Sequence, residues 1–348
     1  MKISNIGIGH NNRVFIIAEL SANHNGSKKQ AIASIRAAKK TGADAIKLQT
    51  YTPNTITIDS RNKSFTSILD DTVWAGYNLF DLYKEAYTPW EWHEELFRIA
   101  REEGIICFSS PFDQTAVDFL ETFNPPAYKI ASFEITDIPL IERVASIGKP
   151  IIFSTGIATA EDIELALDAC MRVDNDQIAI LKCTSSYPAP LDEANMIMIG
   201  DYVKRFNVVP GVSDHTIGNI VPIVATAMGA KIIEKHFIID RSIGGPDASF
   251  SMNEVEFASM VKAVRKSEQA IGVVDYSLTD KQIKSRSFSR SLYVVEDIKI
   301  GERFTGKNIR SIRPGFGIHP KYYHAVLKGK AKCTLERGTP LKSEDIIW

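Results

Sequence analysis

The sequence predicts a (β/α)8 barrel followed by a small β-rich domain. Eight short apolar runs rich in β-branched residues alternate with eight segments of helical periodicity. Residues 1–271 fit the roughly 250 residues that are typical of such a barrel. The alternative is a doubly wound open sheet, which is weakened because AELSANHNGS, and not a GxGxxG fingerprint, follows the first full-length run.

The expected strands and helices alternate in chain order. The strands are expected at 14–18, 45–48, 105–108, 128–131, 150–153, 178–181, 208–212 and 231–233. The helices are expected at 28–40, 89–103, 114–123, 139–146, 159–172, 193–206, 218–228 and 254–271. Several helices begin with recognisable signals, such as Thr88-Pro89, or Thr159 followed by two acidic residues.

One interval between a strand and its helix is unusually long. Residues 51–87 include four large aromatic side chains, Trp74, Tyr77, Phe80 and Tyr83. Long loops in compact domains are commonly functional or disordered, and this aromatic content argues against disorder. We expect either a lid or wall on the substrate side, or an extra helix packed on the barrel rim.

The character of the chain changes after residue 271. Residues 272–287 are polar and predict a linker, and residues 288–348 carry short strands and glycine turns. Within this tail, Gly301 and Gly338 are each followed by an apolar residue at the third position and an isoleucine at the eighth. This 37-residue pseudo-repeat predicts a small β-rich domain of two similar halves.

Composition indicates a globular cytoplasmic protein of enzyme size. Hydrophobic residues make up 44% and the net charge is −1, without the basic stripe expected of a nucleic-acid or anionic-membrane partner. Neither a membrane-spanning run nor a signal-peptide pattern is evident. The four cysteines form no CxxC pair, which predicts reduced thiols.

Polar side chains cluster where the expected strands end, at the rim that carries the active site in parallel barrels. Hydroxyl groups and lysines converging there would make a good site for a multiply charged anion. A single serine in such a place is commonly only a turn or capping residue, so the combination carries the argument. The rim residues are Glu19, Lys47, Gln49, Ser110, Lys129, Ser132, Glu134, Ser154, Ser185, Tyr187, Ser213, His215, His236 and Asp247.

Lys47 and Lys129 lie inside otherwise apolar strands. Burying a lysine is costly unless it is paired, so a functional role is favoured over a purely structural one. Glu19 and Glu134 are similarly placed at the ends of the first and fourth strands. Beside a metal ion or a lysine, these carboxylates could act as acid–base groups or stabilise developing positive charge.

His215 and His236 end the seventh and eighth expected strands. A lone histidine near an apolar strand is commonly a hydrogen-bonded core residue. Neighbouring parallel strands lie about 4.8 Å apart, however, so two imidazoles at one rim can ligate one ion. Two nitrogen ligands near carboxylates and hydroxyls fit a labile Mn²⁺ or Mg²⁺ better than a structural zinc. Such an ion could polarise a carbonyl oxygen.

A series of motifs resembles the sialic acid synthase family and extends over essentially the whole chain. The motifs are IIAELSANHNGS, KLQTYTP, FSSPFD, YKIASFE, CTSSYPAP, GVSDHT, EKHF with GGPDASFSM, and RPGFGI. Members of this family condense phosphoenolpyruvate with an N-acetylated amino sugar and release phosphate. The resemblance implies a (β/α)8 barrel with an antifreeze-like (SAF) domain, in a domain-swapped homodimer whose small domains cap the partner's active site.

The resemblance also implies a role for each residue in these motifs. His215 and His236 are the expected metal ligands. The expected phosphoenolpyruvate site is Lys47, Ser110, Lys129, Ser132, Ser154, Ser185 and Ser213. The residues expected to face the acceptor sugar are Glu19, Gln49, Glu134, Tyr187, Asp247, Phe288 and the partner subunit's Arg313. Among all of these, the expected catalytic groups are Glu19, Lys47, Lys129, Glu134 and Asp247, and Glu19 is expected to support an oxocarbenium-like stage.

Three departures from the N-acetylneuraminate pattern resemble the branch of the family that forms pseudaminic acid. They are Ser21-Ala22 before NHNG, the aromatic loop WAGYNLFDLYKEAYTPWEWH, and GGPDASFSM without the lysine of GPDHKAS. They imply 2,4-diacetamido-2,4,6-trideoxy-altrose as acceptor, because an aromatic wall suits a methyl group in place of a hydroxyl. The alternative is an N-acetylneuraminate or legionaminate synthase with a manno-configured acceptor.

Two readings of other classes compete with this one. The antifreeze-like tail could belong to a non-enzymatic carbohydrate- or ice-binding protein, but a binding module needs no pair of metal-ligating histidines. Another barrel enzyme, such as an aldolase or a deoxy-heptulosonate-type synthase, is the second rival. An aldolase that uses a Schiff-base lysine would lose activity when Lys47 or Lys129 is replaced, but it would survive metal chelation.

Overall fold

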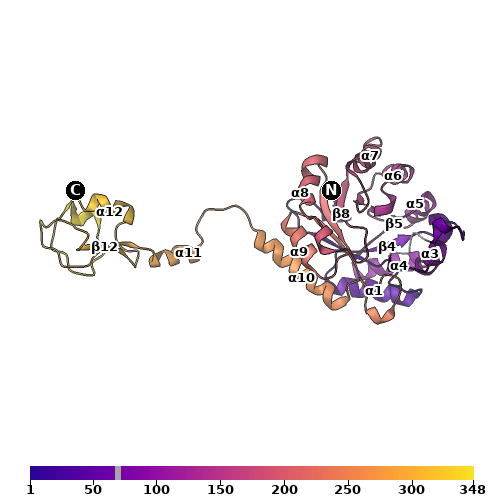
Figure 1. Cartoon of the computed structure of the whole chain (residues 1–348), viewed down its shortest axis with the longest axis horizontal. Helices are drawn as coiled ribbons and strands as arrows, with labels where there is room; N and C mark the ends of the chain where they lie inside the picture. The colour runs from indigo at the N-terminus through magenta and orange to yellow at the C-terminus, as the bar shows by residue number, and fades with distance from the viewer. Residues whose placement is uncertain (67–71) are drawn as a thin grey trace. The chain divides into compact units, whose positions relative to one another are not determined.

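The computed structural model describes residues 1–66 and 72–348 and divides the chain into two compact units. The first unit is Met1–Gly272 and the second is Val273–Trp348 (Figure 1). Each unit has its own hydrophobic core.

The first unit is a closed barrel of eight parallel strands, which confirms the predicted fold class. Each strand pairs with the next one along the chain, and the last strand closes the barrel by pairing with the first. The strands are β3 (Phe15–Glu19), β4 (Ala45–Thr50), β5 (Ile106–Pro111), β6 (Tyr128–Ile130), β7 (Ile151–Ser154), β8 (Ile178–Cys183), β9 (Val209–Asp214) and β10 (Ile232–His236).

Helices surround this barrel (Figure 1). They begin with side-chain caps at several places where the sequence indicates them: Thr159, for example, caps its helix by accepting a hydrogen bond from the backbone of Asp162. The helices are α1 (Lys28–Thr41), α4 (His93–Glu103), α5 (Gln114–Glu121), α6 (Ile138–Ala145), α7 (Ala160–Met171), α8 (Met198–Phe206), α9 (Ile220–Ala227) and α10 (Glu254–Ile271).

Strict alternation along each strand separates two cores. In β3, Phe15 and Ile17 belong to the cluster inside the barrel, whereas Ile16 and Ala18 pack in the cluster between the barrel and the helices. The next inward position after Phe15 and Ile17 is Glu19. In β4, inward Ala45 is likewise followed by Lys47. The apolar filling of the barrel thus ends, and charged side chains begin, at one level.

A short N-terminal hairpin was not expected from the sequence. It consists of β1 (Lys2–Ile3) and β2 (Ile6–Gly7), and the side chains of Ile3 and Ile8 join the inner barrel cluster. These residues pack with Phe15 and Ile17 at the start of β3, so the hairpin lies at the end of the barrel opposite the charged side chains. Two-residue strands are too short to leave a periodic signal in a sequence.

The described part of the long interval between β4 and α4 contains the short α-helices α2 (Pro53–Ile56) and α3 (Leu79–Ala86). Residues 67–71 of this interval lie outside the described part of the chain. Tyr83 of α3 packs edge-on against Tyr51, with ring centroids 5.6 Å apart. The expectation of an extra helix on the rim is thus met by α3.

The second unit begins with a segment that the sequence predicts as a linker, and that contains a short helix, α11 (Asp280–Ser285). Two small antiparallel sheets follow, together with the helix α12. The strands are β11 (Ser291–Val294), β12 (Ile309–Ile312), β13 (Lys330–Ala331) and β14 (Ile346–Ile347), and the helix is α12 (Tyr323–Val326).

The pseudo-repeat of the second unit has a structural counterpart. Phe304 and Ile309 of the first half, and Leu341 and Ile346 of the second half, are buried in one shared core. The glycines that begin the two halves both have positive φ angles, +78° and +94°. Side chains other than glycine rarely adopt this backbone conformation, which explains why both turns carry glycine.

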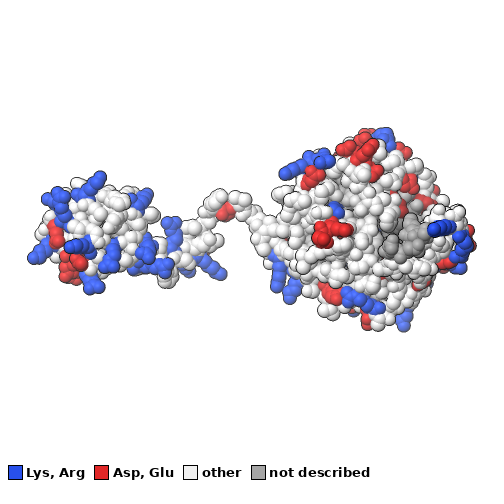
Figure 2. Space-filling view, viewed as in Figure 1, with Lys and Arg blue, Asp and Glu red and all other residues white. Residues whose placement is uncertain are grey.

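Charge is distributed unevenly between the two units. Residues 273–348 contain 15 Lys and Arg against 8 Asp and Glu, a net charge of +7, and basic side chains are spread over this unit in Figure 2. The remaining 26 basic and 34 acidic residues give the first unit a net charge of −8. Among the described residues, none of the helices is long and apolar enough to cross a membrane.

Candidate active site

The inward positions at the C-terminal ends of the strands carry most of the predicted site residues. Glu19, Lys47, Gln49, Ser110, Lys129, Ser154, Ser213 and His236 lie on strands β3, β4, β5, β6, β7, β9 and β10. Ser132, Glu134, Ser185, Tyr187, His215 and Asp247 lie in the loops that directly follow the strands. This end of a parallel barrel is where TIM-barrel enzymes bind their substrates.

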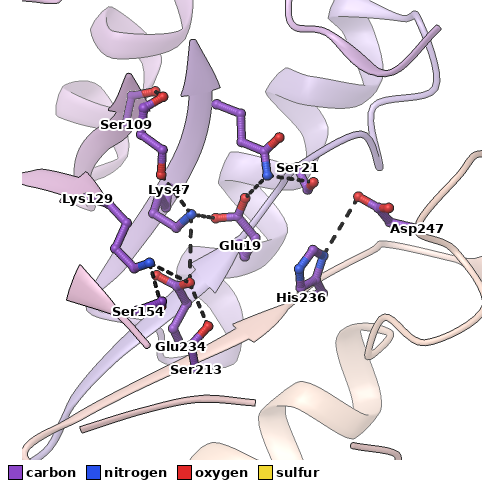
Figure 3. Close-up of polar contacts among 12 residues, drawn as sticks. Glu19, Ser21, Lys47, Ser109, Lys129, Ser154, Ser213, Glu234, His236 and Asp247 are labelled. Carbon is purple, nitrogen blue, oxygen red and sulfur yellow. Dashed lines mark hydrogen bonds and ion pairs between the residues drawn. The ribbon is translucent and has the colours of Figure 1, made fainter. Parts of the chain in front are cut away.

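A buried cluster of two lysines and two carboxylates lies at the centre of this end (Figure 3). The Lys47 ammonium is 2.6 Å from Glu19 Oε2 and 3.7 Å from Glu234 Oε1. The Lys129 ammonium is 3.9 Å from the same oxygen of Glu234. Two ammonium groups therefore meet two carboxylates at this point, and an incoming anion would find both ammonium groups within reach.

The pKa values of these groups reflect their burial. Burial raises the pKa of Glu19 to about 7, although the neighbouring Lys47 acts to lower it. Burial lowers the pKa of Lys129. Burial would also lower the pKa of Lys47, but Glu19 and Glu234 outweigh this effect and raise it. A carboxyl group that titrates near neutral pH can both release and accept a proton, as acid–base catalysis requires.

Glu134 is a second carboxyl group of this kind. It lies in a 3₁₀ turn, Ser132–Glu134, directly after β6. Burial raises its pKa to about 7, while Lys129 acts to lower it. Its Oε2 atom is buried and has no hydrogen-bond partner among the described residues. Buried acceptors are rarely left without a partner, so this atom is suited to a donor group on a ligand.

Hydroxyl groups line the lysine side of the cluster. The Lys47 ammonium donates to Ser110 Oγ at 3.2 Å. The Lys129 ammonium donates to Ser154 Oγ at 2.6 Å (Figure 3). Ser213 Oγ donates to Glu234 Oε1 at 3.0 Å. These contacts combine positive charge with donors that can turn towards an anion.

Ser132 and Ser185 approach each other around Gly156, which follows β7. The backbone N–H of Gly156 donates to Ser132 Oγ at 3.1 Å. A methyl group on Gly156 would lie 2.0 Å from Ser185 Oγ and 2.8 Å from Ser132 Oγ, so no other residue fits without moving both serines. Ser185 Oγ is buried and has no hydrogen-bond partner among the described residues. We call Ser132, Ser154, Gly156 and Ser185 the hydroxyl cradle.

The imidazole rings of His215 and His236 lie side by side, with ring centroids 5.3 Å apart. His215 Nδ1 contacts the backbone carbonyl of Thr184 at 2.9 Å, which leaves its Nε2 for another partner. His236 Nδ1 is buried without a hydrogen-bond partner among the described residues, and Asp247 Oδ2 lies 3.9 Å from it (Figure 3). Burial lowers the pKa of His236 well below its usual value, so this imidazole is neutral at pH 7.

This pair fits a divalent cation in its donor chemistry, and the donor set is small. Neutral imidazoles are good ligands for such ions. The carbonyl of Thr184 accepts a hydrogen bond from His215 Nδ1–H, which fixes the ring and leaves Nε2 to face an ion. Across residues 1–66 and 72–348, no group of three or more His, Cys, Asp or Glu side chains is arranged to hold a metal ion. A metal here would take its remaining ligands from water or substrate.

Aromatic rings form a wall beside the histidines. The Tyr187 ring lies 4.2 Å from the His215 ring and 5.2 Å from the Phe250 ring, measured between centroids. Trp74 reaches this wall from the long interval: its ring lies 5.3 Å from that of Tyr187, and its Nε1 donates to the carbonyl of Pro246 at 3.1 Å. One side of the site is therefore apolar.

Polar groups bound the site on the β3 side. Gln49 Nε2 donates to Glu19 Oε1 at 3.0 Å and to Ser21 Oγ at 2.9 Å. Asp247 Oδ2 accepts a hydrogen bond from the backbone N–H of Ala22 at 3.3 Å. The loops after β3 and β10 are thus tied together near His236.

Two of the predicted site residues, Phe288 and Arg313, lie in the second unit. Both side chains are exposed, and their roles stay predictions. Sequence reasoning did not select Glu234 as a site residue, although this carboxylate contacts both lysines and Ser213. The signal was present: Glu234 lies two positions before His236 on one strand, so the two side chains point to the same side.

The C-terminal end of this closed (β/α)8 barrel carries buried lysines, two carboxyl groups with a raised pKa, and a pair of histidines. These features define a TIM-barrel enzyme. Comparison with known proteins identifies the family. The model of the NeuB family matches residues 34–276, and the SAF domain model matches residues 289–347. The chain belongs to the NeuB family and carries a SAF domain. It is accordingly a transferase, a condensing synthase, which excludes the non-enzymatic reading.

Three similar proteins illustrate the relationship. The pseudaminic acid synthase of Campylobacter jejuni subsp. jejuni serotype O:23/36 (strain 81-176) is 47% identical over 333 residues, which cover 96% of each chain. The N,N'-diacetyllegionaminic acid synthase of Legionella pneumophila is 32% identical, over 95% of this chain and 94% of that protein. The solved N-acetylneuraminic acid synthetase of Leptospira borgpetersenii, in complex with citrate, matches with a TM-score of 0.73 and 30% identity, over 82% of this chain and 94% of that one.

Proposed function

We propose that this chain is a pseudaminic acid synthase, which condenses phosphoenolpyruvate with 2,4-diacetamido-2,4,6-trideoxy-altrose. The observation that carries the proposal is the juxtaposition of an anion site, made by two buried lysines and the hydroxyl cradle, with a pair of histidines whose rings lie 5.3 Å apart. In the reaction, C3 of phosphoenolpyruvate forms a bond to the aldehyde carbon of the open-chain sugar. Water adds at C2, and phosphate leaves with cleavage of its C–O bond.

Lys47, Lys129 and the hydroxyl cradle would bind phosphoenolpyruvate. Its phosphate and carboxylate need several donors and more than one positive charge, and both ammonium groups lie in one buried cluster. Ser110 and Ser154 accept hydrogen bonds from these lysines, so their own O–H groups stay available as donors. Exclusion of water from this cluster strengthens each of these contacts.

His215 and His236 would hold a divalent metal ion, Mn²⁺ or Mg²⁺. When bound, the ion supplies Lewis-acid polarisation of the sugar's carbonyl oxygen. Asp247 adds a carboxylate on the side of His236. We propose that Asp247, Gln49 and Tyr187 also orient the acceptor sugar.

Glu19 is the group that we propose to act on protons during the reaction. Lys47 and Gln49 hold its two carboxylate oxygens, at 2.6 and 3.0 Å. With a pKa of about 7, it can stabilise positive charge that develops on the substrate and can exchange a proton with the attacking water. Glu134, whose pKa is also about 7, is a second candidate for proton transfer, close to Lys129.

Two observations support the 6-deoxy altro-configured acceptor. The identity of 47% to a pseudaminic acid synthase clearly exceeds the 32% to a legionaminic acid synthase over similar coverage. In addition, Trp74, Tyr187 and Phe250 give the site an apolar wall, against which a methyl group packs better than a hydroxyl. A synthase for a manno-configured acceptor is the second candidate, because the same anion site and histidines would serve it.

We further propose that two chains form a domain-swapped homodimer in which Phe288 and Arg313 act in the partner's site. The net charges of +7 and −8 favour contact between a second unit and a first unit. Large apolar side chains at the start of the second unit are almost fully exposed, with Val274 at 91% and Tyr276 at 95%.

Four free thiols also suit the reducing cytoplasm expected from the sequence.

Phosphate release from phosphoenolpyruvate in the presence of Mn²⁺ tests the function. Three acceptors are compared: N-acetylmannosamine, 2,4-diacetamido-6-deoxy-mannose and 2,4-diacetamido-6-deoxy-altrose. We expect turnover with the altro sugar alone. Turnover with a manno sugar would overturn the proposed acceptor and keep the reaction, and release with none of the three would overturn the proposal.

Metal removal tests the second part of the proposal. Prolonged treatment with EDTA should abolish phosphate release, and addition of Mn²⁺ should restore it. An aldolase that depends on a Schiff-base lysine would keep its activity under the same treatment. Full activity in the metal-free chain would contradict the proposed role of His215 and His236.

A further inference from the structure

A second buried ion pair lies directly behind the two histidines. The Lys235 ammonium is 2.5 Å from Asp214 Oδ2, and both side chains are 1% exposed. The two residues face each other in the register of β9 and β10. Asp214 immediately precedes His215 in the chain, and Lys235 immediately precedes His236. Each member of the pair is thus the neighbour of one histidine.

The same ion pair also holds the backbone on the far side of His215. The Lys235 ammonium donates to the carbonyl of Thr216 at 2.6 Å, and Asp214 Oδ1 accepts from the N–H of Thr216 at 2.8 Å. The Asp214 side chain and the Thr216 backbone, on either side of His215 in the chain, are therefore both held by a side chain on the strand that carries His236. We call Lys235, Asp214 and the backbone of Thr216 the clasp.

The clasp cannot take part in the chemistry by contact. Along β10, Glu234 and His236 point into the barrel, where Glu234 meets Lys47 and Lys129. Side chains alternate along a strand, so Lys235 points to the opposite side, towards the helices. Its role must therefore act through the residues that it holds.

We propose that the clasp positions His215 relative to His236, and thereby determines how tightly the chain binds a divalent metal ion. This inference rests on the proposed metal site. A pair of ligands from two strands binds an ion well only when the spacing between them is fixed. Here one ammonium group of β10 binds the residues on either side of His215, and the two rings stand 5.3 Å apart.

A charged pair in this place is better explained by positioning than by stability. Removing two charges from water is costly, and apolar replacements of buried ion pairs commonly leave stability unchanged or improved. An ammonium group, however, offers three directed donors, and two of them here bind the carboxylate and the carbonyl on either side of His215. An apolar side chain could fill the same space but could not fix that backbone.

The test measures metal affinity directly, without catalysis. The full chain is stripped of metal and titrated with Mn²⁺, and the electron paramagnetic resonance signal of free Mn²⁺ gives the dissociation constant. In the double variant Lys235→Met with Asp214→Asn, both charges are removed together, so no unpaired charge is left buried. We expect its dissociation constant for Mn²⁺ to rise by about 10- to 100-fold, as for other residues that orient metal ligands.

A matched control removes an ion pair from the other end of the barrel. Lys149 precedes β7, and Glu121 is the last residue of α5. The Lys149 ammonium lies 2.7 Å from Glu121 Oε1, and both side chains are half-buried. The variant Lys149→Met with Glu121→Gln should bind Mn²⁺ as the unmodified chain does. His236→Ala should show the loss of binding that is expected when a ligand itself is removed.

The outcomes separate this inference from the proposed function. A folded double variant, verified by its circular dichroism and thermal midpoint, that keeps the original Mn²⁺ affinity would overturn the clasp alone. Absence of Mn²⁺ binding by the unmodified chain would overturn the proposed metal site together with the clasp. If the double variant does not fold, Lys235→Gln replaces it, because its shorter side chain cannot reach both the Asp214 carboxylate and the Thr216 carbonyl, and an unchanged affinity there would equally refute the clasp.

Discussion

Gly156 shows how one residue shapes the anion site by having no side chain. Its position leaves room for Ser132 and Ser185 to meet, and a methyl group would lie 2.0 Å from Ser185 Oγ. In Gly156→Ala, both hydroxyl groups should be displaced. We expect kcat/KM for phosphoenolpyruvate to fall on the order of 10- to 100-fold, because displacements of about 1 Å in a site have effects of this size.

Steady-state kinetics with varied phosphoenolpyruvate measures this effect, and Gly200→Ala is the matched control. Gly200 lies in α8 with nothing within 4 Å of the added methyl group, so alanine should leave the kinetics unchanged. It should also stabilise the helix by about 0.5–1 kcal/mol. Normal kinetics in Gly156→Ala would show that the hydroxyl cradle does not bind phosphoenolpyruvate.

At the scale of residues, the sequence predicts which side chains meet at the rim better than it predicts their partners. The inward lysines were recognisable because charge interrupts apolar strands. Of their two counter-charges, Glu19 was predicted and Glu234 was not, because Glu234 follows two isoleucines of β10 and stands beside Lys235. Its spacing from His236 indicates an inward side chain, but only the strand register shows that Glu234 reaches the lysines and Lys235 reaches Asp214.

At the scale of elements, the long interval between β4 and α4 contributes Trp74 to the aromatic wall. Trp74→Ala removes both the ring beside Tyr187 and the hydrogen bond to Pro246. We expect kcat/KM for the 6-deoxy acceptor to fall by about 10- to 100-fold, the range that one apolar contact in a pocket provides. The KM for phosphoenolpyruvate should not change, since Trp74 lies on the side of the histidines.

Trp74→Phe and Tyr77→Phe complete this experiment. Trp74→Phe keeps an aromatic ring but loses the N–H donor, so it should fall between the original chain and Trp74→Ala. Tyr77 belongs to the same interval, but its hydroxyl donates to Glu85 and its side chain is exposed, so Tyr77→Phe should behave normally. Equal loss with both substrates in Trp74→Ala would indicate a general disturbance rather than a specificity role.

Helix α4 begins with His93, a fully buried histidine that gives stability a pH dependence. Its Nε2 lies 2.9 Å from Thr50 Oγ1, and its ring packs edge-on against Phe119. Burial lowers the pKa of His93 from 6.5 to about 4. Between these pH values the unfolded chain therefore binds a proton that the folded chain does not, and this favours unfolding.

The unfolding free energy should thus be unaffected by His93 above pH 6.5 and should decline as the pH falls towards 4. The decline from this one residue is at most about 3 kcal/mol. His93→Phe, which cannot bind a proton, should show a shallower decline in denaturant unfolding between pH 7 and pH 4.5. His10→Asn, at an exposed histidine, is the control. Parallel pH profiles of the original chain and His93→Phe would disprove the assignment.

The elements themselves were predictable to different degrees. Every barrel strand was located, because a buried parallel strand is a continuous apolar run bounded by turns. The N-terminal hairpin and α11 were not, since elements of two to six residues carry too little periodicity. In the second unit, the repeated glycine and its following apolar residues located both halves of one core.

At the scale of the whole molecule, the two units carry net charges of opposite sign. The second unit carries its excess of Lys and Arg along its entire length, and the first unit has the opposite excess. If the proposed domain swap is correct, an active site needs Glu19 from one chain and Arg313 from the other. This requirement can be tested by mixing two defective variants.

Glu19→Gln and Arg313→Ala should each be nearly inactive as pure proteins. Mixed at high salt, where attraction between opposite charges is screened, and then returned to low salt, the chains should redistribute into mixed dimers. With random pairing, half of the dimers are mixed and each has one intact site, so about a quarter of the original activity should return. If both residues act within one chain, the mixed dimer contains no intact site, and the mixture should stay as inactive as its components.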